Sequence, residues 1–173
     1  GCEMGDDGFY YRDGEKVGFV ISVSAGDQVR IDMAQIAAQE LEEIGMDVSV
    51  EIPAQTDWAG QMAFLIGWGS PFDADDHTYK VFGTDKGANY SGYSNADVDK
   101  YLTEARQSAD PEVRAEAYAN FQKALAEDPA YAMICYIDAN YVADSNIKGI
   151  DPDTIMGHHG VGIFWNVADW TIE

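Results

Sequence analysis

The residues best placed to do chemistry follow a short apolar run, residues 63–66, which ends at Gly67, Trp68 and Gly69. Glycine has no Cβ atom, so a ligand can come close enough to hydrogen-bond the main chain there. The indole of Trp68 would offer a large apolar ring beside that bare backbone. This arrangement favours holding a small molecule against the wall of a cleft, and it does not by itself indicate bond breaking. The alternative is that Trp68 is a core residue at the end of a strand.

Three aspartates, Asp73, Asp75 and Asp76, come next, and three interpretations compete for them. Calcium binding would need a loop glycine and a bidentate glutamate where Thr84 stands. Hydrolysis would need a raised pKa and a second carboxylate across a cleft, and the sequence shows neither. The spacing is typical of a solvated helix start, where acidic side chains interact favourably with the helix dipole. A carboxylate hydrolase built around Asp73 and Asp76 is the enzyme alternative, and replacing both would abolish its turnover.

The histidines and cysteines predict neither a metal site nor a nucleophile. His77 stands alone in an expected helix, and His158 and His159 lie in a glycine-rich stretch typical of an exposed loop. Cys2 and Cys135 have no CxxC spacing. Cys135 is expected to be a buried free thiol, with a Cys2–Cys135 bridge in an oxidising compartment as the alternative. No phosphate loop, nucleophile elbow or dinucleotide fingerprint occurs, so we expect no cofactor and no enzyme.

The composition excludes several other classes. The chain has 173 residues, of which 46% are hydrophobic and 12% aromatic, and this is enough for a globular core. Ten Lys and Arg residues stand against 31 Asp and Glu residues, and a formal charge of −21 repels nucleic acid and anionic lipid. No apolar run has the length of a membrane-spanning helix, and no signal peptide is present. We expect a mature, processed or excised chain that is monomeric.

These residues need elements to position them, and the first half of the chain predicts a β-helix-β order. Residues 16–24 and 46–52 alternate like strands, and residues 27–44 form a helix between them that Asp27 caps and Gly45 ends. Short links in this order favour a parallel pair. The apolar run 63–66 predicts a third strand, central because it does not alternate. The helix is expected to bury a stripe of Ile36, Ala37, Leu41 and Ile44.

The second half predicts helices, then strands. A loop or small hairpin opens the chain, and residues 73–82 form a short helix. Ser94 caps a longer helix over residues 94–108, and Asp110-Pro111 opens another that ends near Ala126. The core side chains of this last helix are Tyr118, Phe121 and Leu125. Residues 131–137 and 141–143 are predicted to be a strand pair, and residues 150–173 an irregular tail.

Several short motifs occur in an order and spacing that are together quite specific. They are Asp7-Gly8 with residues 12–16, then residues 41–48, Gly67-Trp68, residues 89–93 with 97–102, and Asp128-Pro129. They resemble the C-terminal lobe of the extracellular solute-binding proteins that include the oligopeptide-, dipeptide- and nickel-binding proteins of ABC importers. The resemblance implies an α/β fold, a mixed sheet flanked by helices, as one lobe of a two-lobe periplasmic-binding-protein-like fold. Residues 1–173 would be that single lobe, a fragment of a longer chain, with residues 150–173 returning towards the missing first lobe.

The same resemblance implies a ligand site. Trp68 would form an apolar wall, and the main chain of Gly69 and Ser70 would pair with the ligand. Phe72 belongs to the same loop, and Asn89 and Tyr90 either reach the cleft or form a turn that packs Tyr90 against the lobe. Peptide binders of the family hold the ligand's amino group with an aspartate three residues after the tryptophan. This chain has Pro71 there, so Asp73 becomes the candidate anchor.

The function implied is capture of short peptides in an interlobe cleft, outside the cytoplasm, by the solute-binding component of an ABC importer. The permease in the membrane would be its partner, and the parent would be free or lipid-anchored. The alternatives are a metal chelate or an oligosaccharide. The string from Trp68 to Asp73 is closer to the nickel-binding branch, but Lys86 stands where that branch has its histidine, which disfavours nickel. The segment 56–62 is shorter than the helix that the family usually has before this strand, either through a true deletion or because part of the chain is absent.

Overall fold

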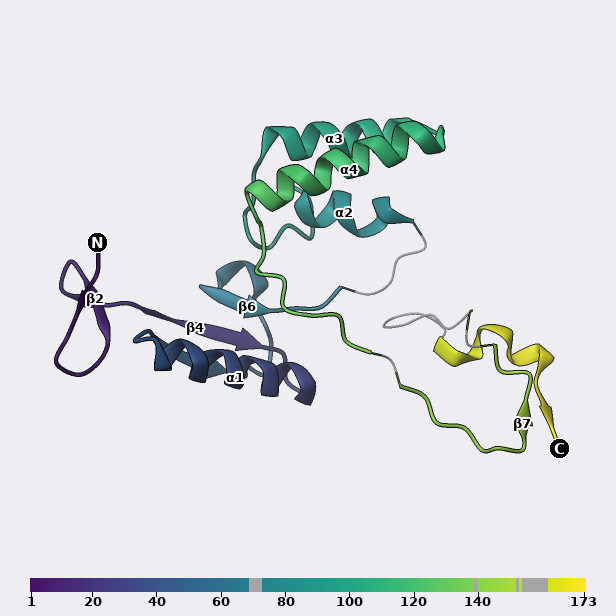
Figure 1. Cartoon of the computed structure of the whole chain (residues 1–173), viewed down its shortest axis with the longest axis horizontal. Helices are drawn as coiled ribbons and strands as arrows, with labels where there is room; N and C mark the ends of the chain where they lie inside the picture. The colour runs from purple at the N-terminus through teal and green to yellow at the C-terminus, as the bar shows by residue number, and fades with distance from the viewer. Residues whose placement is uncertain (69–72, 139, 152, 154–161) are drawn as a thin grey trace. The chain divides into compact units, whose positions relative to one another are not determined.

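The computed structural model describes residues 1–68, 73–138, 140–151, 153 and 162–173 (Figure 1). They fall into two units, Gly1–Gly67 and Trp68–Glu173, and each is described by itself. The first unit opens with three short antiparallel strands, β1 (Glu3–Met4), β2 (Tyr10–Arg12) and β3 (Glu15–Lys16). Asp13 and Gly14 have positive φ angles of 53° and 84° in the turn between β2 and β3. The predicted hairpin is therefore confirmed, with one extra strand.

A parallel sheet follows in the first unit. Strand β4 (Gly18–Val23) leads to helix α1 (Gln28–Glu43) and then to β5 (Asp47–Glu51), which pairs with β4 in parallel. After a single 3₁₀ turn, η1 (Trp58–Gly60), strand β6 (Ala63–Leu65) pairs with the other edge of β4. The strand order is β5-β4-β6. The parallel β-helix-β unit was predicted correctly, but β4 and not the 63–66 run is the central strand of this sheet.

The core of the first unit lies between α1 and the sheet. Ile31 and Ala34 of α1 pack against Ile21 and Val23 of β4, and all four are buried. The buried face of α1 also includes Ala38, so it follows the 3.6-residue period from Ile31. The predicted stripe is wrong at two positions, because Ile36 and Ile44 are 57% and 61% exposed. Both fall off the face that α1 turns towards β4.

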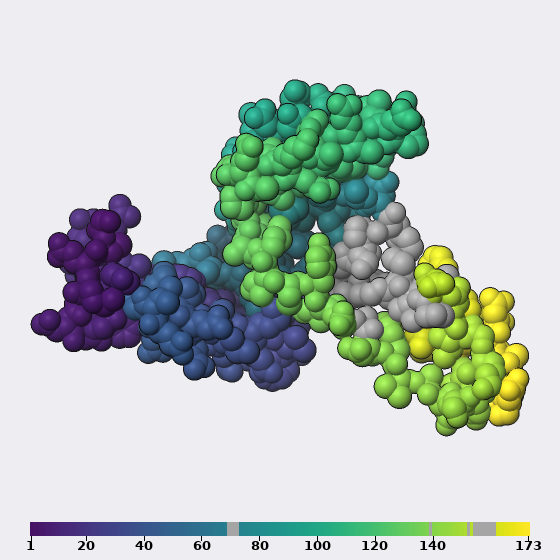
Figure 2. Space-filling model, in the orientation of Figure 1, coloured from purple at the N-terminus to yellow at the C-terminus, as the bar shows by residue number. Residues whose placement is uncertain are grey.

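The second unit begins with three helices, α2 (Ala74–Phe82), α3 (Ala96–Gln107) and α4 (Pro111–Glu127). All three were predicted, but the N-cap of α3 is Asn95 and not Ser94. The Asn95 side chain accepts from the backbone N–H groups of Asp97 and Val98. Val98, Leu102 and Phe121 form the buried centre between α3 and α4. In the space-filling view these helices form one continuous teal-to-green mass (Figure 2). Tyr118 and Leu125 pack against this centre, as predicted.

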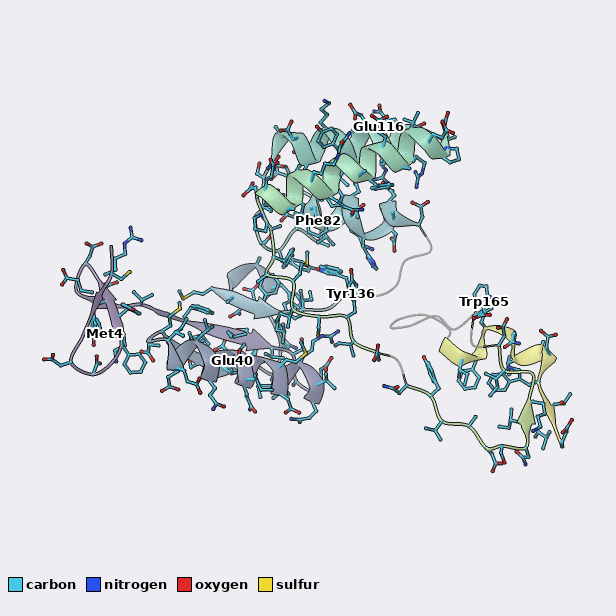
Figure 3. All side chains as sticks on the ribbon, viewed as in Figure 1. Met4, Glu40, Phe82, Glu116, Tyr136 and Trp165 are labelled. Atoms are coloured by element: carbon cyan, nitrogen blue, oxygen red, sulfur yellow. The ribbon has the colours of Figure 1, made fainter. Side chains whose placement is uncertain are left out.

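The segment after α4 departs from the prediction. Residues 131–138 and 140–143 form no strand, so the predicted strand pair is wrong for the described residues. Met133, Ile134 and Ile137 are exposed, and Tyr136 is fully exposed (Figure 3). A β-strand needs a partner for its backbone groups, and none of the described strand pairings includes this segment. Cys135 is likewise exposed rather than buried, and it is a free thiol, as is Cys2.

The tail is less irregular than predicted. Strand β7 (Ile147–Lys148) pairs antiparallel with β8 (Thr171–Ile172), and the 3₁₀ helix η3 (Gly162–Asp169) precedes β8. The Asn166 side chain donates to the carbonyl of Gly149 at 2.7 Å and accepts from the Trp170 indole at 2.9 Å. The α/β class with helices and mixed strand pairing is confirmed. No helix in the described ranges is long and apolar enough to cross a membrane.

Candidate functional site

Trp68 is the centre of an aromatic cluster at the start of the second unit. Its indole stacks on the ring of Tyr90, with centroids 6.2 Å apart and an interplanar angle of 15°. The imidazole of His77 lies against the same indole at 5.8 Å and 48°. Trp68 is half-buried, and its Nε1 has no hydrogen-bond partner among the described residues. An indole N–H can only donate, so this cluster pairs a rigid apolar surface with one unused donor.

His77 reaches this cluster from α2. Its side chain is 22% exposed, and its Nε2 lies 3.6 Å from a carboxylate oxygen of Asp76. The Nδ1 atom is buried and has no hydrogen-bond partner in the described part of the chain. The prediction for His77 was a surface or satisfied core residue. Its partly buried ring against Trp68 fits neither description, since Nε2 faces a carboxylate and the buried Nδ1 has no described partner.

Tyr90 is presented by a turn that Asn89 builds. The Asn89 amide donates to the carbonyls of Gly83 at 2.9 Å and Tyr93 at 2.7 Å, and its Oδ1 accepts from the Tyr93 N–H at 3.0 Å. Ser91 Oγ donates to the same Oδ1 at 3.3 Å. These bonds use both ends of the amide. Of the two roles left open for Asn89 and Tyr90, the turn that packs Tyr90 against its own unit is the one that the structure describes.

Asp73 is the N-cap of α2, and its carboxylate already has partners. Oδ1 accepts from the Asp75 N–H at 2.8 Å, and both oxygens accept from Arg114 Nη2 at 2.7 Å. The backbone bond from Asp75 and then the Arg114 guanidinium hold the pKa of the Asp73 carboxyl below its usual 3.8. The same pair raises the pKa of Arg114. Asp73 is therefore ionised and engaged, not a vacant anchor for an amine.

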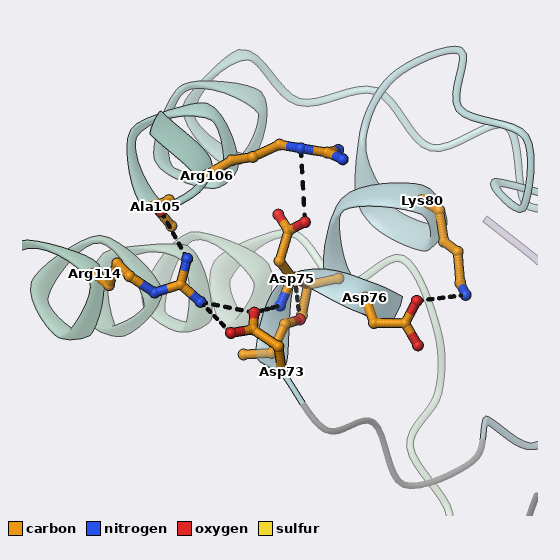
Figure 4. A network of polar contacts seen from close by, with 9 residues as sticks. Asp73, Asp75, Asp76, Lys80, Ala105, Arg106 and Arg114 are labelled. Atoms are coloured by element: carbon orange, nitrogen blue, oxygen red, sulfur yellow. Dashed lines mark hydrogen bonds and ion pairs between the residues drawn. The ribbon is translucent and has the colours of Figure 1, made fainter. Parts of the chain in front are cut away.

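The other two aspartates of this stretch are paired as well (Figure 4). Asp75 lies 3.6 Å from Arg106 of α3, and Asp76 lies 3.1 Å from Lys80 one turn along α2. Asp75 and Asp76 also occupy the first turn of α2, where the helix dipole favours negative charge. This is the solvated helix start that the sequence predicted. No group of three or more metal-ligating side chains occurs among the described residues.

Known proteins resemble this chain, although no family model matches it. Protein XP55 of Streptomyces lividans is 34% identical over 157 residues, which cover 87% of this chain and 29% of XP55. The oligopeptide-binding protein AppA of Bacillus subtilis is 26% identical over 175 residues, 95% of this chain and 31% of AppA. The crystal structure of NikZ from Campylobacter jejuni in complex with Ni(L-His) superposes with a TM-score of 0.82 and 34% identity, over 99% of this chain and 36% of NikZ.

The chain is similar to part of an oligopeptide-binding protein and of NikZ, and its fold is that of one lobe of such two-lobe solute-binding proteins. It spans about a third of the length of the relatives that it matches. The resemblance seen in the short motifs is thereby confirmed at the level of family and fold. The relatives named for a function are binding proteins and not enzymes.

The structure describes only some of the residues that the sequence predicted to bind ligand. Trp68, Asp73, Asn89 and Tyr90 are described, and Trp68 and Tyr90 are brought together. Asp73 is held by Arg114 instead. Three predicted contacts lie outside the described residues, namely Gly69, Ser70 and Phe72, and so do His158 and His159.

Two residues of the solute-binding lobe were missed or undervalued from the sequence. Arg114 reaches Asp73 across 41 positions of the chain, and no local pattern indicates such a pair. His77 carried a weak signal, because it lies four residues after the helix cap and therefore on the same side of α2 as Asp73. A Cβ at Gly67 would meet the guanidinium of Arg30, so a larger residue there would require that side chain to shift.

Proposed function

We propose that the protein is the extracytoplasmic solute-binding component of an ABC importer and that it captures short peptides in a cleft between two lobes. The observation that carries the proposal is the Trp68 ring, which packs with the rings of Tyr90 and His77 and has a buried indole N–H without a described partner. A rigid aromatic surface with few polar groups can accept ligands of varied side chain. The similarity to AppA, an oligopeptide-binding protein, supports peptides as the solute class.

Capture would follow the hinge-bending scheme of two-lobe binding proteins. Solute held by this lobe would lower the free energy of the closed state, and membrane permease subunits would then recognise that state. In this scheme the chain is the C-terminal lobe of a longer monomeric protein, and residues 150–173 lead back to the other lobe. The parent works in the periplasm or on the outer face of the membrane, either free or lipid-anchored. The net charge of −21 fits a surface that avoids nucleic acid and anionic lipid.

The pairing of the aspartates opposes the hydrolase alternative. A carboxylate that acts as a general acid needs a pKa raised towards neutrality, and one that acts as a base needs a free oxygen aimed at substrate. The pKa of Asp73 is lowered, and both of its oxygens bond to Arg114. Asp76 pairs with Lys80 on its own helix. These contacts are those of a helix start.

A metal chelate is the second candidate solute. NikZ, whose structure contains Ni(L-His), is 34% identical over nearly the whole of this chain. His77 also places an imidazole nitrogen without a described hydrogen-bond partner beside Trp68, and imidazole is a preferred ligand of nickel. Lys86 stands where the nickel-binding branch has its own histidine, so His77 would have to take that role. An oligosaccharide stacked on Trp68 is the third candidate.

The deciding experiment is a thermal-shift screen of the full-length protein with short peptides, the nickel–histidine chelate and small oligosaccharides. A ligand at one hundred times its Kd stabilises by about 2.7 kcal/mol, which is readily measured. We expect peptides to raise the melting temperature and Trp68→Ala to abolish the shift. Trp165→Ala is the matched control, because it removes an equally large ring that is 53% exposed in η3. A shift with chelate or sugar alone would replace peptides as the solute, and a peptide shift that survives Trp68→Ala would exclude Trp68 as the wall.

A further inference from the structure

We infer that Arg114 is a positioning residue for the ligand surface, because it fixes the helix against which the Trp68 ring rests. The expected effect of Arg114 on ligand affinity rests on the proposed function. The expected effect of Arg114 on the position of α2 rests only on contacts within the second unit. Arg114 contacts Asp73 at the N-cap of α2. It acts through Asp73 and α2.

Arg114 joins three helices with one side chain. It belongs to the first turns of α4, and its Nη2 donates to both carboxylate oxygens of Asp73 at 2.7 Å, at the N-cap of α2. Its Nη1 donates at 3.1 Å to the carbonyl of Ala105. That carbonyl lies in the last turn of α3, where main-chain acceptors have no partner within the helix. The Arg114 side chain is 24% exposed, so these charge-assisted bonds are partly shielded from water.

The position of α2 decides the position of the Trp68 ring. Asp73 caps α2, and His77 lies four residues later, one turn further along the same side of the helix. The His77 ring packs against Trp68 at 5.8 Å. A shift in where α2 begins therefore moves the ring that supports Trp68. Arg106 adds a second contact to α2 from α3, at 3.6 Å from Asp75.

The same helix offers a matched control. Lys80 pairs with Asp76 at 3.1 Å, and both residues belong to α2. Lys80→Met removes one positive charge beside one α2 aspartate, as Arg114→Met does, but it breaks no link between α2 and another helix. A purely electrostatic effect on ligand binding would follow both substitutions. A positioning effect would follow Arg114→Met alone.

The experiment uses the full-length protein with trialanine and the nickel–histidine chelate as probes, and it measures Kd by calorimetry. We expect Arg114→Met and Asp73→Asn each to raise Kd on the order of tenfold, and the double variant to raise it no further, because both remove one link. Asparagine keeps the N-cap acceptor, so Asp73→Asn separates the cap from the ion pair. Arg114→Lys keeps a charge at Asp73 and should recover most of the affinity, and Lys80→Met should bind like the wild type.

A second measurement does not depend on ligand. The ¹⁹F resonance of 5-fluorotryptophan at position 68, assigned with Trp68→Phe, should shift in Arg114→Met and stay in place in Lys80→Met. Unchanged Kd and resonance in Arg114→Met would overturn the positioning role while leaving the proposed function intact. If the wild type binds neither probe, the proposed function fails and the resonance still tests the link. Should Arg114→Met not fold, an unaltered Kd and resonance in Asp73→Asn would overturn the inference.

Discussion

Asn89 gives a sharp test, because the sequence left it either at the ligand or in a turn, and the structure describes the turn. Its side chain makes three hydrogen bonds to main-chain atoms, with Gly83 at 2.9 Å and with Tyr93 at 2.7 and 3.0 Å. A net hydrogen bond contributes about 0.5–1.5 kcal/mol to stability. The three are only partly buried, so water replaces some of what Asn89→Ala removes. We therefore expect the free energy of unfolding to fall by about 2–3 kcal/mol.

Urea unfolding of the full-length protein measures this change, monitored by both circular dichroism and fluorescence because two lobes need not unfold together. Ser91→Ala is the matched control, since it loses only the exposed 3.3 Å bond to Asn89 and should change stability by less than about 0.5 kcal/mol. The Kd for ligand should rise only severalfold in Asn89→Ala, through a looser Tyr90. A tenfold or larger loss of affinity with unchanged stability would show that Asn89 contacts the ligand and that its assignment to the turn is wrong.

Two further predictions concern the helices. Leu102→Ala should lower the free energy of unfolding by about 2–5 kcal/mol in urea titrations, because Leu102 is 1% exposed between α3 and α4, whereas Ile36→Ala on the exposed face of α1 should cost little. The Asp73 carboxyl has a lowered pKa in the folded state, so its stabilising effect is complete above its unfolded value of 3.8 and disappears as the pH falls through the folded value. The difference in Tm between wild type and Asp73→Asn should therefore be constant near neutral pH and narrow as the pH falls below about 3.8, and a difference that did not change with pH would contradict the lowered pKa.

Helix ends were predictable from the sequence because their signals are local. Asp27 caps α1 by accepting from the Arg30 N–H, and Gly45 follows the helix with a φ of 89°. Asp110 and Pro111 open α4 as predicted. The N-cap of α3 was misplaced by one residue, because Ser94 and Asn95 are both good caps and only the fold decides between them.

Strand order and strand existence were less predictable, because each depends on a partner far along the chain. The run 63–66 is apolar without alternation, yet β6 pairs only with β4 in the described sheet. The segment 131–137 has the composition of a strand but forms none, and Met133 is 71% exposed. A pattern of side chains reports which faces could be buried and carries no information about whether a neighbouring strand is present.

In the candidate site too, features set by the local sequence were predictable and contacts set by the fold were not. Trp68 was predicted from glycine, aromatic ring and strand end, all within three positions. Its support by Tyr90 and His77 depends on how α2 and the turn at Asn89 fold, and the local sequence does not specify it. Arg114 had no local signal, because what distinguishes it is an aspartate 41 residues away.

The ion pair between Asp73 and Arg114 changes where a cationic group of the solute is expected to bind. A ligand ammonium at Asp73 would have to compete with Arg114, whose two bonds to the carboxylate are already formed. The Asp73 side chain is 59% exposed, and exchanging one cation for another in an exposed pair gains little free energy. The face of an aromatic ring attracts a cation by about 0.5–2 kcal/mol without displacing a bound partner. A cationic end-group of the solute should therefore be drawn to the Trp68 and Tyr90 rings rather than to a carboxylate. Affinity should then depend more on Trp68 than on the charge of Asp73 itself.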